Sequence, residues 1–202
     1  MPVMTATSTA HADAVLRRLP AHRPIVGAEV GVLCGKLSQR LLVARPNLAT
    51  LYMIDRWSAA AADAAAWSRR NREPCHRLTD DDHADHYARA CGVAERHPGR
   101  ATIVPADSLT AAESIPDASL DFVFLDADHR REAVAADIRA WLPKVKPGPM
   151  SWIGGHDYDA TPRRIAWGPE VKSAVDDAAD THGWSVETDV FFTWFAAIGG
   201  DA

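Results

Sequence analysis

Residues 120–129 read LDFVFLDADH, a nearly continuous apolar run that ends in two carboxylates and an imidazole. A run that is apolar at almost every position is typical of a central strand in a parallel sheet, because such a strand is buried on both faces. In open sheets of this class, ligands bind outside the carboxyl ends of the strands. The stretch therefore predicts a buried strand that holds Asp126, Asp128 and His129 at a functional edge of the sheet.

The same order of strand and helix recurs on both sides of this stretch. Further apolar runs and segments of helical period alternate along the chain, the runs at 25–31, 50–55, 101–107 and 150–154 and the helical segments at 36–44, 108–115, 129–142 and 169–182. Buried strands joined by helices predict an α/β fold with a doubly wound, mostly parallel sheet. The runs at 184–188 and 190–198 follow the last helix and suit a closing antiparallel hairpin.

Length and composition describe one ordinary globular domain over residues 1–202. Hydrophobic residues make up 47% of the chain and charged residues 24%, so we expect a packed core, with only the first ten residues frayed. The net charge is -5 and no basic stripe stands out, which argues against nucleic acid as a partner. No apolar run approaches the roughly 20 residues of a membrane span, and three cysteines fit a reducing compartment. We therefore expect a cytoplasmic protein without a membrane partner, and the sequence leaves a homo-oligomer open.

Residues 58–100 are too many for an ordinary connection between two elements of such a fold. AAAADAAAW and DDHADHYARAC within them have helical propensity, so we predict a helical insertion after the second strand. On the ligand side of a sheet, an insertion of this kind is expected to serve as a lid or a substrate wall. Its histidines and cysteines match no standard zinc-finger spacing, and we interpret them as solvated or substrate-facing: Cys75, His76, His83, His86 and Cys91.

Two other strand ends carry residues suited to ligand binding. The first run leads through Glu29 into a glycine turn with Gly31 and Gly35, and Ser38 follows in the next helix. Glycine lets the backbone pass close to a ligand there, while Glu29 either faces that ligand or is a buried, hydrogen-bonded acid. Asp55 ends the second run, roughly 20 residues after the glycine turn. At this spacing along the chain a carboxylate can accept hydrogen bonds from both hydroxyls of a ribose.

Asp107 and Ser108 end the third run. Any single acidic strand end can be a helix N-cap, and Asp128 with His129 could equally cap the helix that follows them. Several acidic ends in register with one glycine turn point instead to a shared ligand site. The turn lacks the GxGxxG spacing of a dinucleotide-binding protein, which argues against an NAD-dependent oxidoreductase.

The chain resembles the class I S-adenosylmethionine-dependent methyltransferases in the motifs EVGVLCGKLS, YMIDRW, PADS, DFVFLDADHRREAVAADIRAWLPKVKPG and GGHDY, over roughly residues 25–158. The pattern is most similar to the group called family 24, which is related to macrocin and catechol O-methyltransferases. The resemblance implies a Rossmann-like sheet of seven strands, the last antiparallel, with S-adenosylmethionine as the cofactor. It assigns the cofactor-binding role to Glu29, Gly31, Gly35, Ser38, Asp55, Arg56, Trp57, Asp107, Ser108 and Asp126.

The resemblance also implies a metal site. In related metal-dependent O-methyltransferases, residues at the ends of the fourth and fifth strands hold Mg²⁺, and the matching residues of this chain are Asp126, His156 and Asp157, which leaves Asp128 as a candidate base. His156 is the unusual ligand because Mg²⁺ prefers oxygen, and an imidazole also suits the role of general base. The sequence leaves both roles of His156 open.

The function implied by this resemblance is methyl transfer from S-adenosylmethionine to a hydroxyl of a small-molecule acceptor, with the assistance of a metal such as Mg²⁺. Two alternatives stay open. One is a metal-independent N- or O-methyltransferase in which His156 is the base. The other is a non-catalytic partner subunit that binds S-adenosylmethionine.

Overall fold

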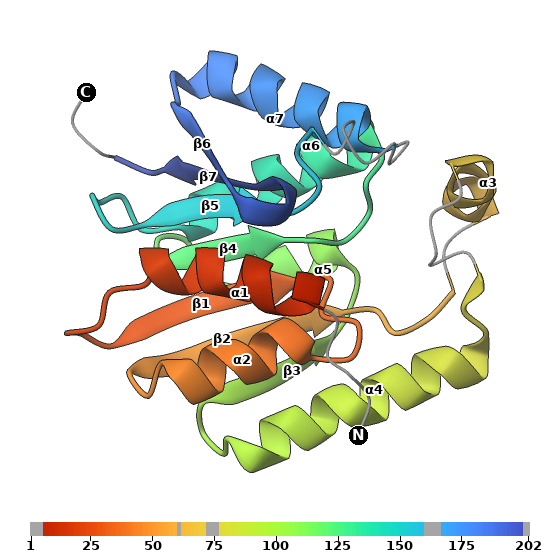
Figure 1. Cartoon of the computed structure of the whole chain (residues 1–202), viewed down its shortest axis with the longest axis horizontal. Coiled ribbons are helices and arrows are strands. Elements are labelled where there is room, and N and C mark those ends of the chain that lie inside the picture. The colour runs from red at the N-terminus through yellow and green to blue at the C-terminus, as the bar shows by residue number, and fades with distance from the viewer. Residues whose placement is uncertain (1–5, 60–61, 72–76, 160–166, 200–202) are drawn as a thin grey trace.

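In the computed structural model, which describes residues 6–59, 62–71, 77–159 and 167–199, one sheet has the strand order β3-β2-β1-β4-β5-β7-β6 (Figure 1). Strands β1 to β5 pair in parallel, and β7 pairs antiparallel with both β5 and β6. The bounds are β1 (Ile25–Val30), β2 (Leu48–Asp55), β3 (Ala101–Pro105), β4 (Phe122–Leu125), β5 (Trp152–Gly155), β6 (Val186–Asp189) and β7 (Thr193–Ala197). The structure thus confirms the doubly wound, seven-stranded, mostly parallel sheet and its closing antiparallel hairpin.

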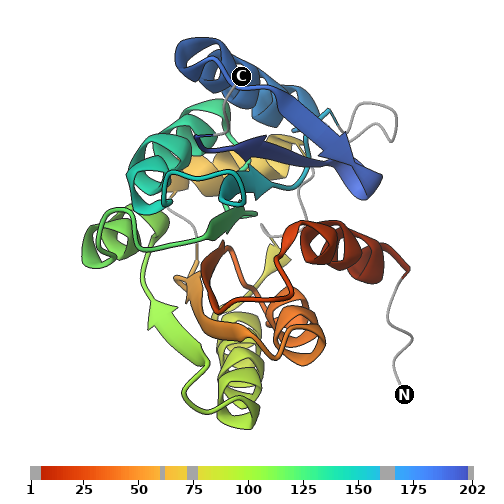
Figure 2. The same cartoon turned by 90° about the vertical axis from the view of Figure 1, so that its left-hand side faces the viewer.

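Helices cover both faces of this sheet (Figure 2). One face carries α1 (Ala6–Arg18), α2 (Lys36–Ala44) and α4 (Asp80–Arg96), and the other carries α5 (Ser108–Ser114), α6 (Arg131–Trp141) and α7 (Gly168–His182). Helix α3 (Ala62–Asn71) stands apart from the sheet in Figure 1, and the short 3-10 turns are η2 (Leu142–Lys144) and η4 (Val190–Phe192). No helix in the described ranges combines the length and the hydropathy needed to cross a bilayer.

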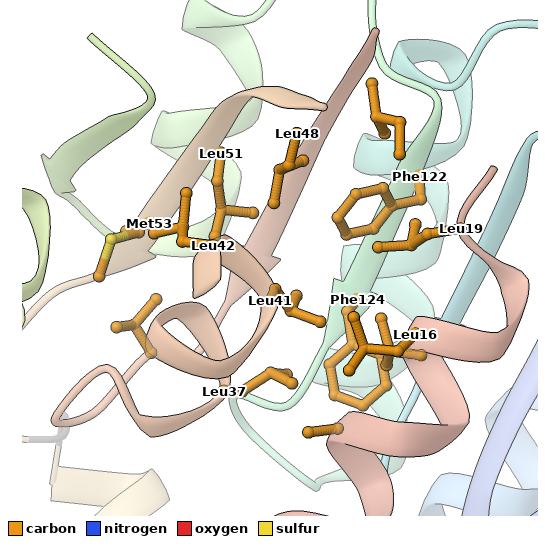
Figure 3. Packing of buried hydrophobic residues seen from close by; sticks show 14 of the residues in the cluster. Leu16, Leu19, Leu37, Leu41, Leu42, Leu48, Leu51, Met53, Phe122 and Phe124 are labelled. Atoms are coloured by element: carbon orange, nitrogen blue, oxygen red, sulfur yellow. The ribbon is translucent and has the colours of Figure 1, made fainter. Parts of the chain in front are cut away.

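Strand β4 forms the centre of the core because all four of its side chains are buried. Phe122 and Phe124 pack with the residues of α1 and α2, whereas Val123 and Leu125 pack with those of α5, α6 and α7. Figure 3 shows Leu16 of α1, and Leu19 directly after it, beside the two phenylalanine rings. Full burial of such a side chain stabilises the fold by about 1.5–3 kcal/mol, so the core holds this strand firmly up to Leu125, the residue before Asp126.

Helix α1 corrects the expectation of a frayed start for residues 6–10, while residues 1–5 lie outside the described ranges. It begins at Ala6, and Ala12, Ala14 and Val15 are fully buried in the core. At its end, Arg18 donates to Asp189 at 2.8 Å, which ties the helix to the closing hairpin. The small and polar residues of its first turns hide the helical period, and packing against the sheet decides the structure.

The long connection between β2 and β3 contains α3 and α4, as the helical propensity of 58–100 predicted. A capping box between Thr79 and Asp82 starts α4, and Ala90 with Val93 buries one face of the helix in the core. Helix α4 therefore forms the crossover that leads into β3, against which it packs. The role of 58–100 as a lid or substrate wall stays a prediction.

Gly31, the residue after β1, allows a close contact with the residue after β4. Gly31 has φ +93°, and a Cβ atom there would lie 2.0 Å from the carbonyl oxygen of Asp126. We expect Gly31→Ala to lower the free energy of unfolding by about 2–4 kcal/mol, because the clash adds to the cost of the left-handed backbone. Urea unfolding measures this loss.

Gly99→Ala is the matched control for Gly31→Ala. Gly99 has φ +73° but would place its Cβ in open space, so it carries the backbone cost alone, about 1–2 kcal/mol. Equal losses in the two variants would show that the approach of Asp126 to Gly31 does not matter for stability.

Candidate active site

The carboxyl ends of β1, β2, β4 and β5 meet at one edge of the sheet. The last residues of β1, β4 and β5 are paired in register, and the last residue of β1 pairs with Ile54, one residue before the end of β2. The residues that follow β1, β4 and β5 are Gly31, Asp126 and His156, and Asp55 ends β2 beside them. The structure therefore brings the sequence-predicted residues of four strand ends to one edge.

Asp55 connects the end of β2 to the glycine turn after β1. Its two carboxylate oxygens accept the backbone N–H groups of Leu33 at 2.8 Å and of Trp57 at 2.9 Å. The indole of Trp57 donates in turn to the carbonyl of Leu33 at 2.7 Å. Both Leu33 and Trp57 have positive φ, a conformation that residues other than glycine rarely adopt. The hydrogen bonds therefore hold two adjacent loops in unfavourable backbone conformations.

Glu29 is buried at 3% exposure and accepts a hydrogen bond from the hydroxyl of Ser38. Burial raises the pKa of Glu29 to about 8, although the Ser38 hydrogen bond opposes the shift. Glu29 is therefore protonated at neutral pH, in line with the sequence-based alternative of a buried, hydrogen-bonded acid. A contact between Glu29 and the cofactor stays a prediction.

A cleft of about 540 Å³ opens where β2 and β3 end. The rings of Trp57 and Tyr87 lie 5.0 Å apart in its wall. The sequence-predicted Arg56 and Trp57 line it together with residues from the β2–β3 connection and the end of β3, namely Ser58, Asp80, His83, Ala84, Tyr87 and Pro105. The cleft is lined by aromatic and polar groups at the sheet edge where ligands of this fold class bind.

Asp107 and Ser108 follow β3, and both have partners within the fold. Asp107 caps α5 by accepting from the backbone N–H of Thr110 at 3.1 Å and from its hydroxyl at 2.7 Å. Ser108 accepts from the indole of Trp141 at 2.9 Å. Asp107 is therefore the N-cap of α5, one of the roles considered for any acidic residue at a strand end. The contact of Asp107 and Ser108 with the adenine stays a prediction.

Two carboxylates and two imidazoles form a cluster at the ends of β4 and β5. His129 Nε2 lies 3.1 Å from Asp157 Oδ2 and 3.4 Å from Asp126 Oδ1. His156 Nδ1 lies 3.0 Å from Asp157 Oδ1 and 4.0 Å from Asp126 Oδ1. Asp157 therefore stands between the two histidines, with one carboxylate oxygen directed toward each.

The charges of this cluster shift its pKa values in opposite directions. Burial alone would lower the pKa of His156, but the hydrogen bond to Asp157 and the charge of Asp126 outweigh it and raise the pKa. Burial alone would raise the pKa of Asp157, yet hydrogen bonds and charge from His156 and His129 lower it to about 2. Asp157 is therefore a carboxylate at neutral pH, and His156 titrates above the ordinary histidine value.

Asp128 is bound by the side chain of Arg130. The guanidinium donates to both carboxylate oxygens of Asp128 at 2.8–3.1 Å and reaches Asp63 of α3 at 2.7 Å. The N-cap of α6 is Arg130, which has no side-chain cap, and Asp128 Oδ1 accepts the backbone N–H of Arg130 at 3.0 Å. Asp128 thus satisfies a backbone donor at the start of the helix without being its N-cap residue. The role of Asp128 as a base stays a prediction, with its oxygens engaged by Arg130.

The group that could hold a metal differs in one member from the sequence-predicted set. Asp126, His129 and Asp157 offer ligand atoms that all lie within 4.8 Å of one another. His129 is thus a further candidate ligand, three residues after Asp126 in the sequence, and the set with His156 that the resemblance implied stays a prediction. Cys75 and His76 of the insertion lie outside the described residues.

Sequence reasoning also missed His11 of α1. Its ring meets the ring of His156 edge-on, with 5.2 Å between the centroids. A residue so far from the strand ends in the sequence carried no signal for the site, because only the packing of α1 on the sheet brings it there.

Known proteins resemble this chain in sequence pattern and in fold. A family model described as a methyltransferase domain matches residues 28–158. The chain belongs to the class I S-adenosylmethionine-dependent methyltransferases. No protein with a curated description matches the sequence of this methyltransferase.

Solved structures share the fold of this methyltransferase at low sequence identity. A protein of Corynebacterium glutamicum is 13% identical, with a TM-score of 0.62 over 100% of this chain and 93% of that chain. The precorrin-6y C5,15-methyltransferase of Geobacter metallireducens is 14% identical, with a TM-score of 0.59 over 93% and 87%. A methyltransferase of Podospora anserina with bound S-adenosylhomocysteine is 9% identical, with a TM-score of 0.59 over 98% and 89%.

In this methyltransferase, one further carboxyl lies under the cluster, on the otherwise apolar face of α6. Asp137 is 6% exposed and lines a small cavity of about 10 Å³ together with His129 and His156. Burial raises the pKa of Asp137 to about 7, although a hydrogen bond with Ser108 opposes the shift. The helical period of 129–142 predicted the apolar face but not this buried acid.

Proposed function

We propose that this methyltransferase transfers the methyl group of S-adenosylmethionine to a hydroxyl of a small molecule, with His156 as the general base. The observation that supports this proposal is the pairing of His156 Nδ1 with Asp157 Oδ1 at 3.0 Å. The remaining ring nitrogen, Nε2, is buried and has no hydrogen-bond partner within the described part of the chain. Asp157 thereby favours the tautomer in which Nε2 carries the lone pair, as an acid does in a catalytic triad.

A base of this kind suits a hydroxyl acceptor. As the acceptor oxygen attacks the methyl carbon, the carbon–sulfur bond breaks, its electron pair goes to sulfur, and S-adenosylhomocysteine leaves. The hydroxyl proton passes to Nε2 of His156, so the charge of the sulfonium ends on the imidazolium. The carboxylates of Asp157 and Asp126 then stabilise that imidazolium.

The runner-up is transfer to an amine. A neutral amine already carries a lone pair and needs less help from a base, so the oriented His156–Asp157 pair favours the hydroxyl. A coupled assay for S-adenosylhomocysteine with matched phenols, alcohols and amines separates the two. Release with hydroxyl acceptors and none with their methyl ethers supports the proposal, whereas release with amines alone overturns it. A chain that binds cofactor but releases no product with any acceptor would be the non-catalytic partner subunit.

The cofactor is proposed to lie along the edge from the glycine turn to the cleft. In this placement Glu29, Gly31, Gly35 and Ser38 stand near the methionine part, Asp55 near the ribose, and Arg56, Trp57, Asp107 and Ser108 near the adenine. Asp126 then stands at the reacting end, close to His156. The cleft supports this placement because it opens at the end of β2 directly after Asp55.

Tyr87→Ala tests the cleft as the adenine site. Tyr87 is 38% exposed and lines the cleft, so its removal should leave the fold intact and weaken S-adenosylhomocysteine binding. Loss of one aromatic platform for a base costs about 1–3 kcal/mol, so we expect Kd to rise about 5- to 100-fold in calorimetry. Val43→Ala, exposed at the far end of α2, is the control and should bind as the wild type does. An unchanged Kd in Tyr87→Ala would place the adenine elsewhere.

A further inference from the structure

We propose that Trp167, at the start of α7, is a positioning residue that fixes the orientation of Asp157 and, through Asp157, the tautomer of His156. The inference rests on the proposed function for its effect on catalysis, because it concerns the proposed base. The indole Nε1 of Trp167 donates to Asp157 Oδ2 at 2.6 Å. His156 Nδ1 lies 3.0 Å from the other oxygen, Asp157 Oδ1. Trp167 and His156 therefore hold opposite oxygens of one carboxylate.

The contacts on Oδ2 decide which oxygen of Asp157 faces the proposed base. The terminal torsion of an aspartate side chain has broad minima, so a single partner leaves the carboxylate able to turn. Oδ2 lies against two groups, the indole N–H of Trp167 and, at 3.1 Å, His129 Nε2. With Oδ2 engaged in this way, Oδ1 is the oxygen that remains for Nδ1 of His156.

Asp157 needs support of this kind because its backbone is strained. Its φ is +61°, in the left-handed region that residues other than glycine rarely adopt. Such a residue keeps its conformation only where the surrounding structure fixes it. The side chain of Asp157 is 7% exposed, so contacts within the protein must do this. The hydrogen bond from Trp167 is one of them, and it comes from α7 rather than from the end of β5.

Trp167 is itself held firmly by the elements around it. It is the N-cap of α7, and its carbonyl accepts from the backbone N–H groups of Glu170 at 3.0 Å and Val171 at 3.1 Å. Val171 is buried in the core, which fixes the first turn of the helix. The indole ring stacks on the ring of His129, with 5.8 Å between the centroids. The N–H donor is thus placed by packed secondary structure, as precise positioning of a functional pair requires.

Trp167→Phe tests this inference because phenylalanine keeps an aromatic ring beside His129 and removes the N–H donor. We expect kcat to fall about 10- to 100-fold, since a small misplacement of a reacting group can cost about 100-fold. The KM for the hydroxyl acceptor and the Kd for S-adenosylhomocysteine should stay within about twofold, because Trp167 is proposed to contact neither. A rise in KM with kcat unchanged would make Trp167 a substrate contact and overturn the inference.

Trp184→Phe is the matched control. Trp184 follows the other end of α7 and stacks on His182, with 4.8 Å between the ring centroids. The same exchange therefore removes an indole N–H beside a histidine that lies away from the site. This variant should keep the wild-type kcat and KM, and an equal loss of kcat in both variants would overturn the inference.

NMR of the full chain with isotope-labelled histidine nitrogens reads the tautomer of His156 directly, at a pH where the imidazole is neutral. Its signals are assigned by their loss in His156→Ala. In the wild type and in Trp184→Phe the proton should reside on Nδ1, whereas Trp167→Phe should show a measurable fraction with the proton on Nε2. An unchanged tautomer in Trp167→Phe would overturn the inference, even if kcat falls.

The two readouts separate this inference from the proposed function. A changed tautomer in Trp167→Phe, together with a wild-type kcat in His156→Ala, would refute the proposed base and leave the positioning of Asp157 by Trp167 standing. If His156→Ala is inactive and Trp167→Phe keeps the wild-type kcat, His156 remains the base and the inference is refuted.

Discussion

His156→Ala should lower kcat by about 100- to 10,000-fold, the range that a general base contributes, while S-adenosylhomocysteine affinity stays within about twofold. The reason is that the Nε2 atom of His156 is the proposed proton acceptor, whereas the cofactor is proposed to lie on the other strand ends. Steady-state kinetics with the best hydroxyl acceptor and calorimetry with S-adenosylhomocysteine measure the two quantities separately. A kcat within about threefold of the wild type would remove His156 from the reaction.

The pH profile distinguishes a base from a structural histidine. The base must be neutral, so the rate should rise with pH through the raised pKa of His156, with a midpoint above the usual 6.5. Asp157→Asn removes the hydrogen bond that raises this pKa and leaves the burial that lowers it, so the midpoint should move to lower pH while kcat falls. His182→Ala should leave the profile unchanged. A profile that stays the same in Asp157→Asn would contradict the role of the His156–Asp157 pair.

Asp137→Asn should stabilise the protein strongly at high pH. Burial raises the pKa of Asp137 from 3.8 to about 7, so the folded state holds a proton that the unfolded state releases between these values. The free energy of unfolding therefore falls as the pH rises from about 4 to 7, by up to about 4 kcal/mol. Asparagine avoids this cost because it has no proton to lose and keeps a hydrogen-bonding group near Ser108.

Urea unfolding of wild type and Asp137→Asn at several pH values measures this effect. The variant should gain about 2–4 kcal/mol at pH 8 and less than about 1 kcal/mol at pH 4. Glu29 also lowers the free energy of unfolding as the pH rises, because its pKa is raised to about 8. Both proteins contain Glu29, so the difference in their free energies of unfolding reports on Asp137 alone. Asp117→Asn, at a side chain that is 70% exposed, is the matched control and should show no such pH-dependent gain. A constant difference across the pH range would mean that folding does not raise the pKa of Asp137.

The sheet could be predicted from the sequence because its strands carry unusually uniform signals. The run around Phe122 is apolar at each position, and burial on both faces is the only environment that suits it. Helix α6 could likewise be predicted from the helical spacing of Val134, Ile138 and Trp141, all of which are buried. Helix α1 gave no comparable signal, since its alanines became core residues only through contact with the sheet.

The placement of the candidate site followed from the same reasoning. Parallel strands end at one edge, so polar residues directly after β1, β2, β4 and β5 had to meet there. Which partner each side chain takes was not predictable in this way. Asp107 became a helix cap, Asp128 was engaged by Arg130, and Glu29 was buried under Ser38, because each of these contacts depends on side chains from neighbouring turns.

The sequence alone determined the sheet, the common edge of its strands and the family of the chain, because hydrophobic periodicity and short motifs are local properties. Only the tertiary structure decided that His129 converges with Asp126 and Asp157, that His156 turns its Nδ1 toward Asp157, and that His11 closes against it. These contacts join residues from α1 and from the ends of β4 and β5. The distances between these elements in space are set by the packing of the core side chains between them. A distance of three ångströms between two side chains is a property of that packing, and no pattern along the chain encodes it directly.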